Sequence, residues 1–126
     1  MSRIDVFRAI SETLQARSKN VKHVELWNHN VEYLEEEAPF DMPAVFVEFG
    51  PINWKPMKDA SVGGCELRLH IVGHQPDTSS EAMVLLADAV AALVTELPFV
   101  RCRVQSLTNH NHDEIVEHIE TFNIIL

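Results

Sequence analysis

Two histidines near the carboxyl end of the chain are the first candidates for chemistry. His110 and His112 stand two residues apart, so an extended backbone would point both rings to the same side. With Asp113 or Glu114 beside them, they could offer two nitrogens and a carboxylate to a metal ion. The stretch is also rich in Asn and Asp, which turns favour in any case. We expect no bound metal or other cofactor, and His110 and His112 are the candidate ligands if one binds.

No catalytic motif accompanies these residues. His70 and His74 lie four apart in a strand-like segment, whereas the HExxH zinc motif needs a helix and a glutamate. The serines have turn or cap roles, and none lies in a GxSxG elbow. Cys65 and Cys102 form no CxxC pair, so two reduced and partly buried thiols are expected. The sequence therefore predicts no catalytic residues and no enzyme.

Composition favours one globular domain spanning residues 1–126. The chain is 46% hydrophobic and 23% charged, which is enough to build a core. Its net charge of −9 argues against a nucleic-acid reader, which needs basic surface to displace counterions from phosphates. The acids crowd into one stretch, for which a solvated loop is the ordinary interpretation; they are Glu32, Glu35, Glu36, Glu37 and Asp41.

Two segments have helical periodicity. Ser2 can cap a first helix, with Asp5 completing a capping box, and the apolar residues that follow at helical spacing are Ile4, Phe7, Ile10 and Leu14. A second helix starts at 78–81 and runs to about Glu96, and its predicted buried stripe is Met83, Leu86, Val90, Leu93 and Val94.

Five segments have the alternation or apolar runs of strands. They are residues 21–27, 44–49, 65–74, 99–107 and 114–126, with a turn predicted over 108–113. The fold class that follows is α+β, a mixed and mainly antiparallel sheet of about five strands with two helices packed on one face. The predicted order is α-β-β-β-α-β-β.

A hairpin arm is predicted around residues 50–64, with its tip near 55–61. Prolines and glycines punctuate this stretch, and a bulky aromatic, a methionine and two positive charges lie on it. An exposed tryptophan often marks recognition, so partner contact is the functional interpretation, and folding of the arm onto its own sheet is the alternative. The candidate partner-contact residues are Trp54, Lys55, Met57 and Lys58.

The last strand is apolar on both faces. Phe122, Ile124 and Leu126 lie on one face, and the other face carries Ile115, Ile119 and Ile125. A strand of this kind must be sandwiched within the molecule or lie against another subunit. Phe122, Ile124 and Leu126 are therefore the candidate self-association residues.

In this order of elements the chain resembles the tail-terminator (tail-completion) proteins of long-tailed bacteriophages and prophages. The resemblance rests on the helix at 4–14, the proline-led strand 43–47 and a projecting hairpin that returns into 67–71. The helix at 80–97 and the terminal strand ending at 120–124 complete it. It is a resemblance of pattern over nearly the whole chain, and related head–tail joining proteins share much of it.

The resemblance implies a structural virion protein, assembled in the host bacterial cytoplasm. Such a protein forms a homo-oligomeric ring, commonly of six subunits, that terminates the tail tube and joins it to the head. Its partners would be tail-tube and head-connector proteins, with DNA only as passing cargo and no membrane. Glu35, Glu36 and Glu37 would line the channel and the arm would reach the last tail-tube ring. The alternative function is a small intracellular metal- or ligand-binding module that uses the His110/His112 turn.

Overall fold

The computed structural model describes residues 1–31, 40–58, 60–112 and 114–126, with residues 111 and 112 described by their backbone alone. Two helices and five strands follow one another in the predicted order α-β-β-β-α-β-β. They are α1 (Arg3–Arg17), β1 (His23–Leu26), β2 (Ala44–Met57), β3 (Ala60–His74), α2 (Ser80–Thr95), β4 (Val100–His112) and β5 (Ile115–Ile125).

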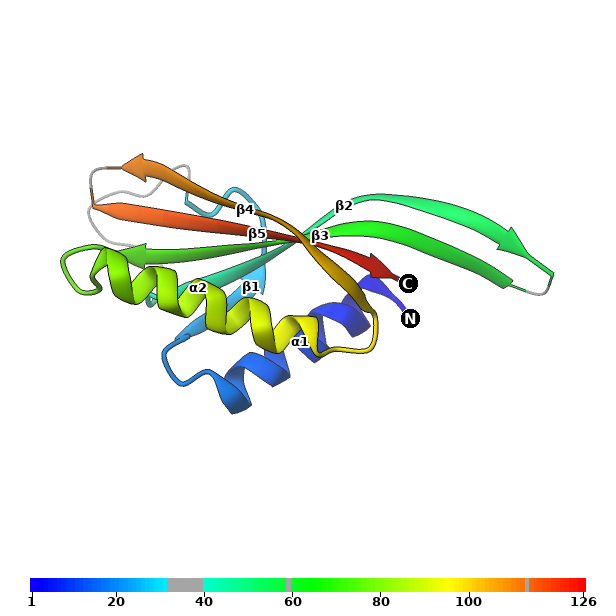
Figure 1. Ribbon diagram of the computed structural model, residues 1–126, viewed down its shortest axis with the longest axis horizontal. Helices are drawn as coiled ribbons and strands as arrows, with labels where there is room; N and C mark the ends of the chain where they lie inside the picture. The colour runs from blue at the N-terminus through cyan, green and yellow to red at the C-terminus, as the bar shows by residue number, and fades with distance from the viewer. Residues whose placement is uncertain (32–39, 59, 113) are drawn as a thin grey trace.

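The strands form one mixed sheet in the order β1-β2-β3-β5-β4. The short β1 pairs in parallel with β2, and the three other pairings are antiparallel. Both helices lie on the same side of this sheet (Figure 1). The α+β prediction with two helices on one face is therefore confirmed.

Both helices begin where the sequence predicts. The Ser2 hydroxyl accepts a hydrogen bond from the Asp5 amide, and the Asp5 carboxylate accepts one from the Ser2 amide, which is the predicted capping box. Ser79 caps α2 by accepting from the Ala82 amide. These bonds satisfy amide groups that the first turn of a helix leaves without partners.

The main core lies between the two helices and the sheet. It is built from Val6, Ile10 and Leu14 of α1, a stripe of α2, and the helix-facing residues of the strands. Most of the predicted stripe of α2 is buried, namely Met83, Leu86, Val90 and Val94. In α1 the predicted Ile10 and Leu14 are buried, but in the first turn Val6 is buried whereas Ile4 is 43% exposed, because Val6, Ile10 and Leu14 follow one another every four residues along one helix face.

A second, smaller cluster lies on the other face of the sheet. Ala44, Phe46, Val72, Ile115 and Val31 form it, with Trp27, Phe40 and Met42 packed against them. Residues 27–31 and 40–42, which follow β1, therefore cover one end of the face that the helices leave open.

β4 differs from the prediction in its length and its burial. The strand continues to His112, so most of the predicted turn over 108–113 is strand instead. Every residue from Arg101 to His110 is exposed, although alternation predicted one buried face. The reason is its place at the edge of the sheet, where β5 alone is its neighbour.

β2 and β3 are much longer than the other elements require. Their pairing continues to Met57 and Ala60, so the tip is tighter than the predicted 55–61. The ladder is irregular between Phe49 and Ile52, and the last contacts of β3 with the end of the chain join Gly63 and Leu126. Beyond that point the two strands project from the body as a two-stranded arm (Figure 1).

Candidate interaction surfaces

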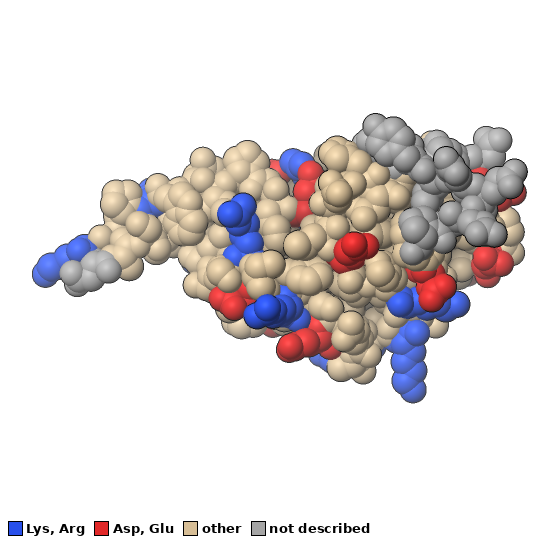
Figure 2. Space-filling model, turned by 180° about the vertical axis from the view of Figure 1, so that it is seen from behind, with Lys and Arg blue, Asp and Glu red and all other residues tan. Residues whose placement is uncertain are grey.

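The arm exposes the four residues that the sequence selected as partner contacts. Trp54 is 56% and Met57 60% exposed, and Lys55 and Lys58 are exposed beside them. Figure 2 shows basic side chains at the far end of the arm. All four therefore lie on the projecting arm, at one end of the molecule (Figure 1).

The register of the hairpin divides these residues between two faces. Ile52 packs against the helix-side core, and because side chains alternate along a strand, Trp54 lies on that same face. Lys55 and Met57 lie on the opposite face, where Lys55 is paired with Val62. The helix side of the arm is therefore aromatic and the other side carries a lysine and a methionine.

Trp54 lies across the neighbouring strand at Gly63. A Cβ atom at position 63 would come within 2.8 Å of the indole ring and of the Ile52 side chain. Glycine at this position lets the indole lie flat on β3.

A groove opens at the root of the arm, between the arm and the start of α1. Its volume is about 520 Å³, within the range of small-molecule and side-chain pockets. It is lined by Met1, Ser2, Arg3, Gly50, Pro51, Ile52, Trp54 and Leu126. The groove is mostly apolar and has one guanidinium group at its wall.

A second exposed apolar surface lies on α2 and was missed from the sequence. Val84 is 49% and Leu85 64% exposed, and small side chains surround them. We call this surface the α2 outer face; it consists of Glu81, Ala82, Val84, Leu85, Asp88, Ala89 and Ala92. The solvent side of α1, by contrast, carries Asp5, Arg8, Glu12 and Gln15. A helix that is apolar on its outer side as well is typical of a contact surface.

Of the residues predicted for self-association, only Leu126 lines the groove. Phe122 and Ile124 are 0% and 1% exposed within the protein's own core, and Leu126 packs against that core. Ile115 is buried in the second cluster on the opposite face. β5 is apolar on both faces because each face packs against a hydrophobic cluster of the same chain. Phe122 and Ile124 therefore offer no surface to a second copy.

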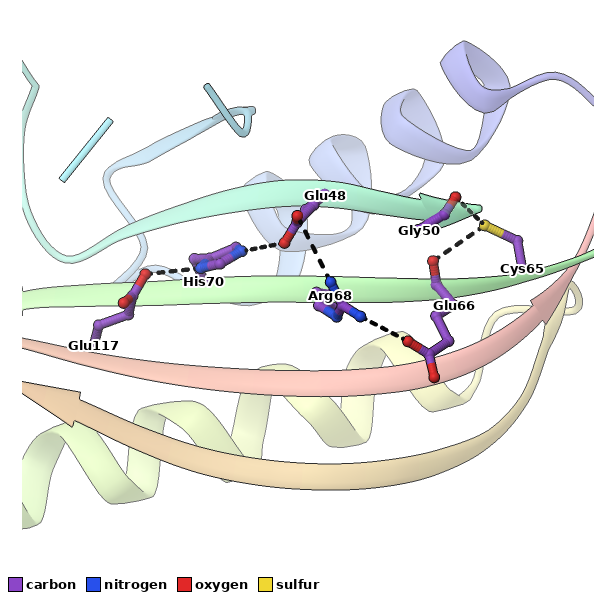
Figure 3. Close-up of polar contacts among 7 residues, drawn as sticks. All are labelled: Glu48, Gly50, Cys65, Glu66, Arg68, His70 and Glu117. Atoms are coloured by element: carbon purple, nitrogen blue, oxygen red, sulfur yellow. Dashed lines mark hydrogen bonds and ion pairs between the residues drawn. The ribbon is translucent and has the colours of Figure 1, made fainter. Parts of the chain in front are cut away.

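A polar network, buried at its His70 and Glu117 end, crosses the open face of the sheet (Figure 3). His70 on β3 places Nδ1 2.7 Å from a Glu117 carboxylate oxygen and Nε2 2.8 Å from one of Glu48. Arg68 continues the row, with its guanidinium 3.8 Å from Glu48 and 2.9 Å from Glu66. The row joins β2, β3 and β5, with carboxylates alternating with the imidazole and guanidinium groups.

This network has the geometry of a structural brace. The His70 and Glu117 side chains are only 6% and 3% exposed. The Trp27 indole stacks on the His70 ring at a centroid distance of 3.8 Å with an interplanar angle of 2°. The Cys65 thiol, on the same strand as His70, directs Sγ at the backbone oxygens of Gly50 and Glu66. Burial raises the pKa of the Cys65 thiol, which keeps it in the unreactive protonated form.

A second network ties α2 to the edge of the sheet. Arg103 on β4 donates from Nη2 to Asp88 of α2 and from Nε to the buried Glu120 of β5, both at 2.9 Å. The pKa of Arg103 is raised above its ordinary value, mainly by the hydrogen bond to Asp88 and also by the one to Glu120. This clasp fixes the helix, and with it the α2 outer face, against β4.

Only part of the predicted metal and channel residues is described by the structure. His110 is exposed on β4, while the His112 side chain and Asp113 lie outside the described residues, as do Glu35, Glu36 and Glu37. Among the residues that are described, no group of three or more His, Cys, Asp or Glu side chains could hold a metal ion. Cys102 is exposed, whereas the sequence predicted a partly buried thiol.

Within the described part of the chain, neither helix has the length and apolar character needed to cross a bilayer. No protein-family model matches the sequence, and no curated protein matches it either. Among solved structures, the fold is similar to a chain of the "virion of native gene transfer agent (GTA) particle". The TM-score is 0.58 at 9% sequence identity, and the match covers 92% of this chain and 90% of the other.

Proposed function

We propose that this protein is a structural component of a phage-like virion. The observation that carries the proposal is the end-to-end likeness to a chain of the gene transfer agent particle, which covers 92% of this chain and 90% of that one. The match therefore spans nearly the whole of both chains. A shared fold alone does not fix function, so the surfaces must support the assignment.

Within the virion, we assign the protein to a homo-oligomeric ring that terminates the tail tube and joins it to the head. The resemblance to tail-terminator proteins suggests this role, and the exposed surfaces suit it. A ring subunit needs surface for its neighbours and further surface for the tube and the connector. The arm and the α2 outer face both expose large apolar side chains that a monomer would have reason to cover.

The charge of the chain suits a conduit for DNA. Ten basic and nineteen acidic residues leave a net charge of −9. Phosphate binding needs cationic surface to release counterions, so an acidic ring would let DNA pass without holding it. DNA is therefore cargo in this proposal, and the partners are proteins of the tail tube and the head connector.

The test is the assembly state of the purified protein. Negative-stain images should contain rings with a central hole, and light scattering should give a mass that is a whole multiple of 14.3 kDa. A protein that stays monomeric at the highest concentration reached would overturn the ring assignment.

A further inference from the structure

We propose that the ring is held together by a head-to-tail contact in which the α2 outer face of one copy seats in the root groove of the next. The groove side consists of Arg3, Ile52, Trp54 and Leu126. The contact rests on the proposed ring and names the two surfaces that build it.

The two surfaces match in apolar character. Val84 and Leu85 stand out from α2 and are about half or more exposed. The groove is concave and its wall offers the side chains of Ile52, Trp54 and Leu126. Tryptophan and arginine are enriched among the residues that contribute most to protein interfaces, and the groove offers one of each in Trp54 and Arg3.

The two surfaces also match in charge. From Ser80 to Thr95 the chain has two acids, Glu81 and Asp88, and no lysine or arginine, for a net charge of −2. On the groove side the charged lining residue is the exposed Arg3, whereas Lys55 lies on the opposite face of the arm. Glu81 lies four positions before Leu85 and therefore on the same helix face, where it is the acid left for a second copy because Asp88 is paired with Arg103 of its own chain. Opposite charges around an apolar centre would fix the orientation of the docked helix.

The placement of the surfaces excludes contact within one chain. In Figure 1 the amino-terminal half of α2 lies at one end of the long axis, and the arm projects from the other end. One copy cannot close the contact on itself, whereas successive copies can. Contacts between different surfaces of identical copies generate rings when the rotation closes.

The lengths of the two elements are compatible. The six residues from Ile52 to Met57 extend about 20 Å at strand spacing. The sixteen residues of α2 extend about 24 Å at helix spacing. A helix lying along the helix side of the arm would therefore be covered over most of its length, and Lys55 and Met57 on the other side would stay free for the tail tube.

The experiment uses two variants that each damage one half of the contact. Leu85→Asp places a charge on the α2 outer face, and Trp54→Asp places one in the groove. Both residues are exposed, so circular dichroism and melting should show a folded protein for each. We expect each variant alone to lose the rings that the unaltered protein forms. Met57→Asp is the matched control, because it puts the same charge on the opposite side of the arm, and it should keep the rings.

Mixing the two variants tests the head-to-tail geometry. Each retains the half that the other lacks, so an equimolar mixture should form a one-to-one dimer and no ring, as measured by native mass spectrometry of mass-tagged chains. Rings that survive both substitutions would overturn this contact while leaving the proposed ring function standing. Loss of rings without a dimer in the mixture would overturn the head-to-tail arrangement. Absence of rings in the unaltered protein would instead count against the proposed function itself.

Discussion

At the scale of single residues, His70 has contacts at both ring nitrogens and at the plane of its ring. Each ring nitrogen faces a carboxylate oxygen, and the ring plane lies against Trp27. Both contacts are hydrogen bonds only when both nitrogens carry a hydrogen, because carboxylates accept and do not donate. His70 thus links three strands through one buried polar centre. Removal of its side chain should therefore lower the free energy of unfolding.

We expect His70→Ala to lower the free energy of unfolding by about 3 kcal/mol, since it removes the closest partner of the buried Glu117. Urea denaturation measures the change. The matched control is His23→Ala, which breaks a His–Glu pair whose side chains are 34% and 52% exposed. That pair should contribute less than about 1 kcal/mol. Equal losses for the two variants would contradict a bracing role for His70.

The pKa values of two other histidines should be shifted in opposite directions. Hydrogen bonds from His74 to Asp77 and then to Glu114 raise its pKa above the ordinary 6.5. Burial lowers the pKa of His118 below 6.5. Ring signals followed by NMR should show His74 titrating above and His118 below that value, and the reverse order would contradict the contacts described.

These two pKa shifts make stability change with pH in opposite directions. The stabilisation from His74 is fully present below pH 6.5 and is lost as the pH rises through its raised pKa. For His118, the unfolded chain takes up a proton more readily than the folded one, so stability is lost as the pH falls below 6.5. The ion pairs of His74 are solvent-exposed, which keeps its contribution small.

At the scale of elements, the sequence predicts most of the structure because the signals are local. Caps such as Ser2 and Ser79 and the stripe of α2 depend on neighbours three or four residues away. The exposure of β4 depends on its place in the sheet, which no local pattern contains. Alternation in Arg101–Gln105 resembles that of a half-buried strand, and the structure shows an edge instead.

The polar network escaped prediction for the same reason. Its partners lie 22 and 47 residues from His70 in sequence. One signal was available: Glu48 interrupts the apolar strand Ala44–Phe49, and Arg68 and His70 share the polar face of the clearest strand. A charge in a central strand needs a partner across the sheet, which would have pointed to these residues together.

Close packing between β3 and α2 supplies a prediction at this scale. Gly73 faces Met83 so closely that a Cβ atom would overlap the Met83 sulfur. We expect Gly73→Ala to destabilise the protein by about 1–3 kcal/mol through overpacking. The control is Gly64→Ala on the same strand, where a Cβ meets nothing within 4 Å. Thermal melting should separate the two variants, and an unchanged midpoint for Gly73→Ala would show that Met83 can move aside.

At the scale of the whole molecule, the protein has a different surface at each end of its long axis. The arm and its groove lie at one end, and the amino-terminal half of α2 lies at the other (Figure 1). The arm can be predicted from the sequence because tryptophan, proline and lysine mark it. The α2 outer face cannot, because an alanine-rich helix resembles an ordinary core helix until the packing is known.

The ring prediction belongs to this scale. Two different complementary ends on every copy would produce an open filament if the rotation between copies did not close. We therefore expect a single discrete mass that stays constant over a range of concentrations in sedimentation experiments. A ladder of sizes growing with concentration would indicate an open assembly instead.

The construction of the arm has a mechanical consequence. β3 runs without interruption from Ala60 at the tip to His74 at the far side of the core. Inside the body it is hydrogen-bonded to β2 on one side and to β5 on the other. Ladder bonds lie perpendicular to the strands, so a pull along the arm loads them in shear and all at once. The arm therefore behaves as a stiff tether whose anchor is the hydrophobic core itself.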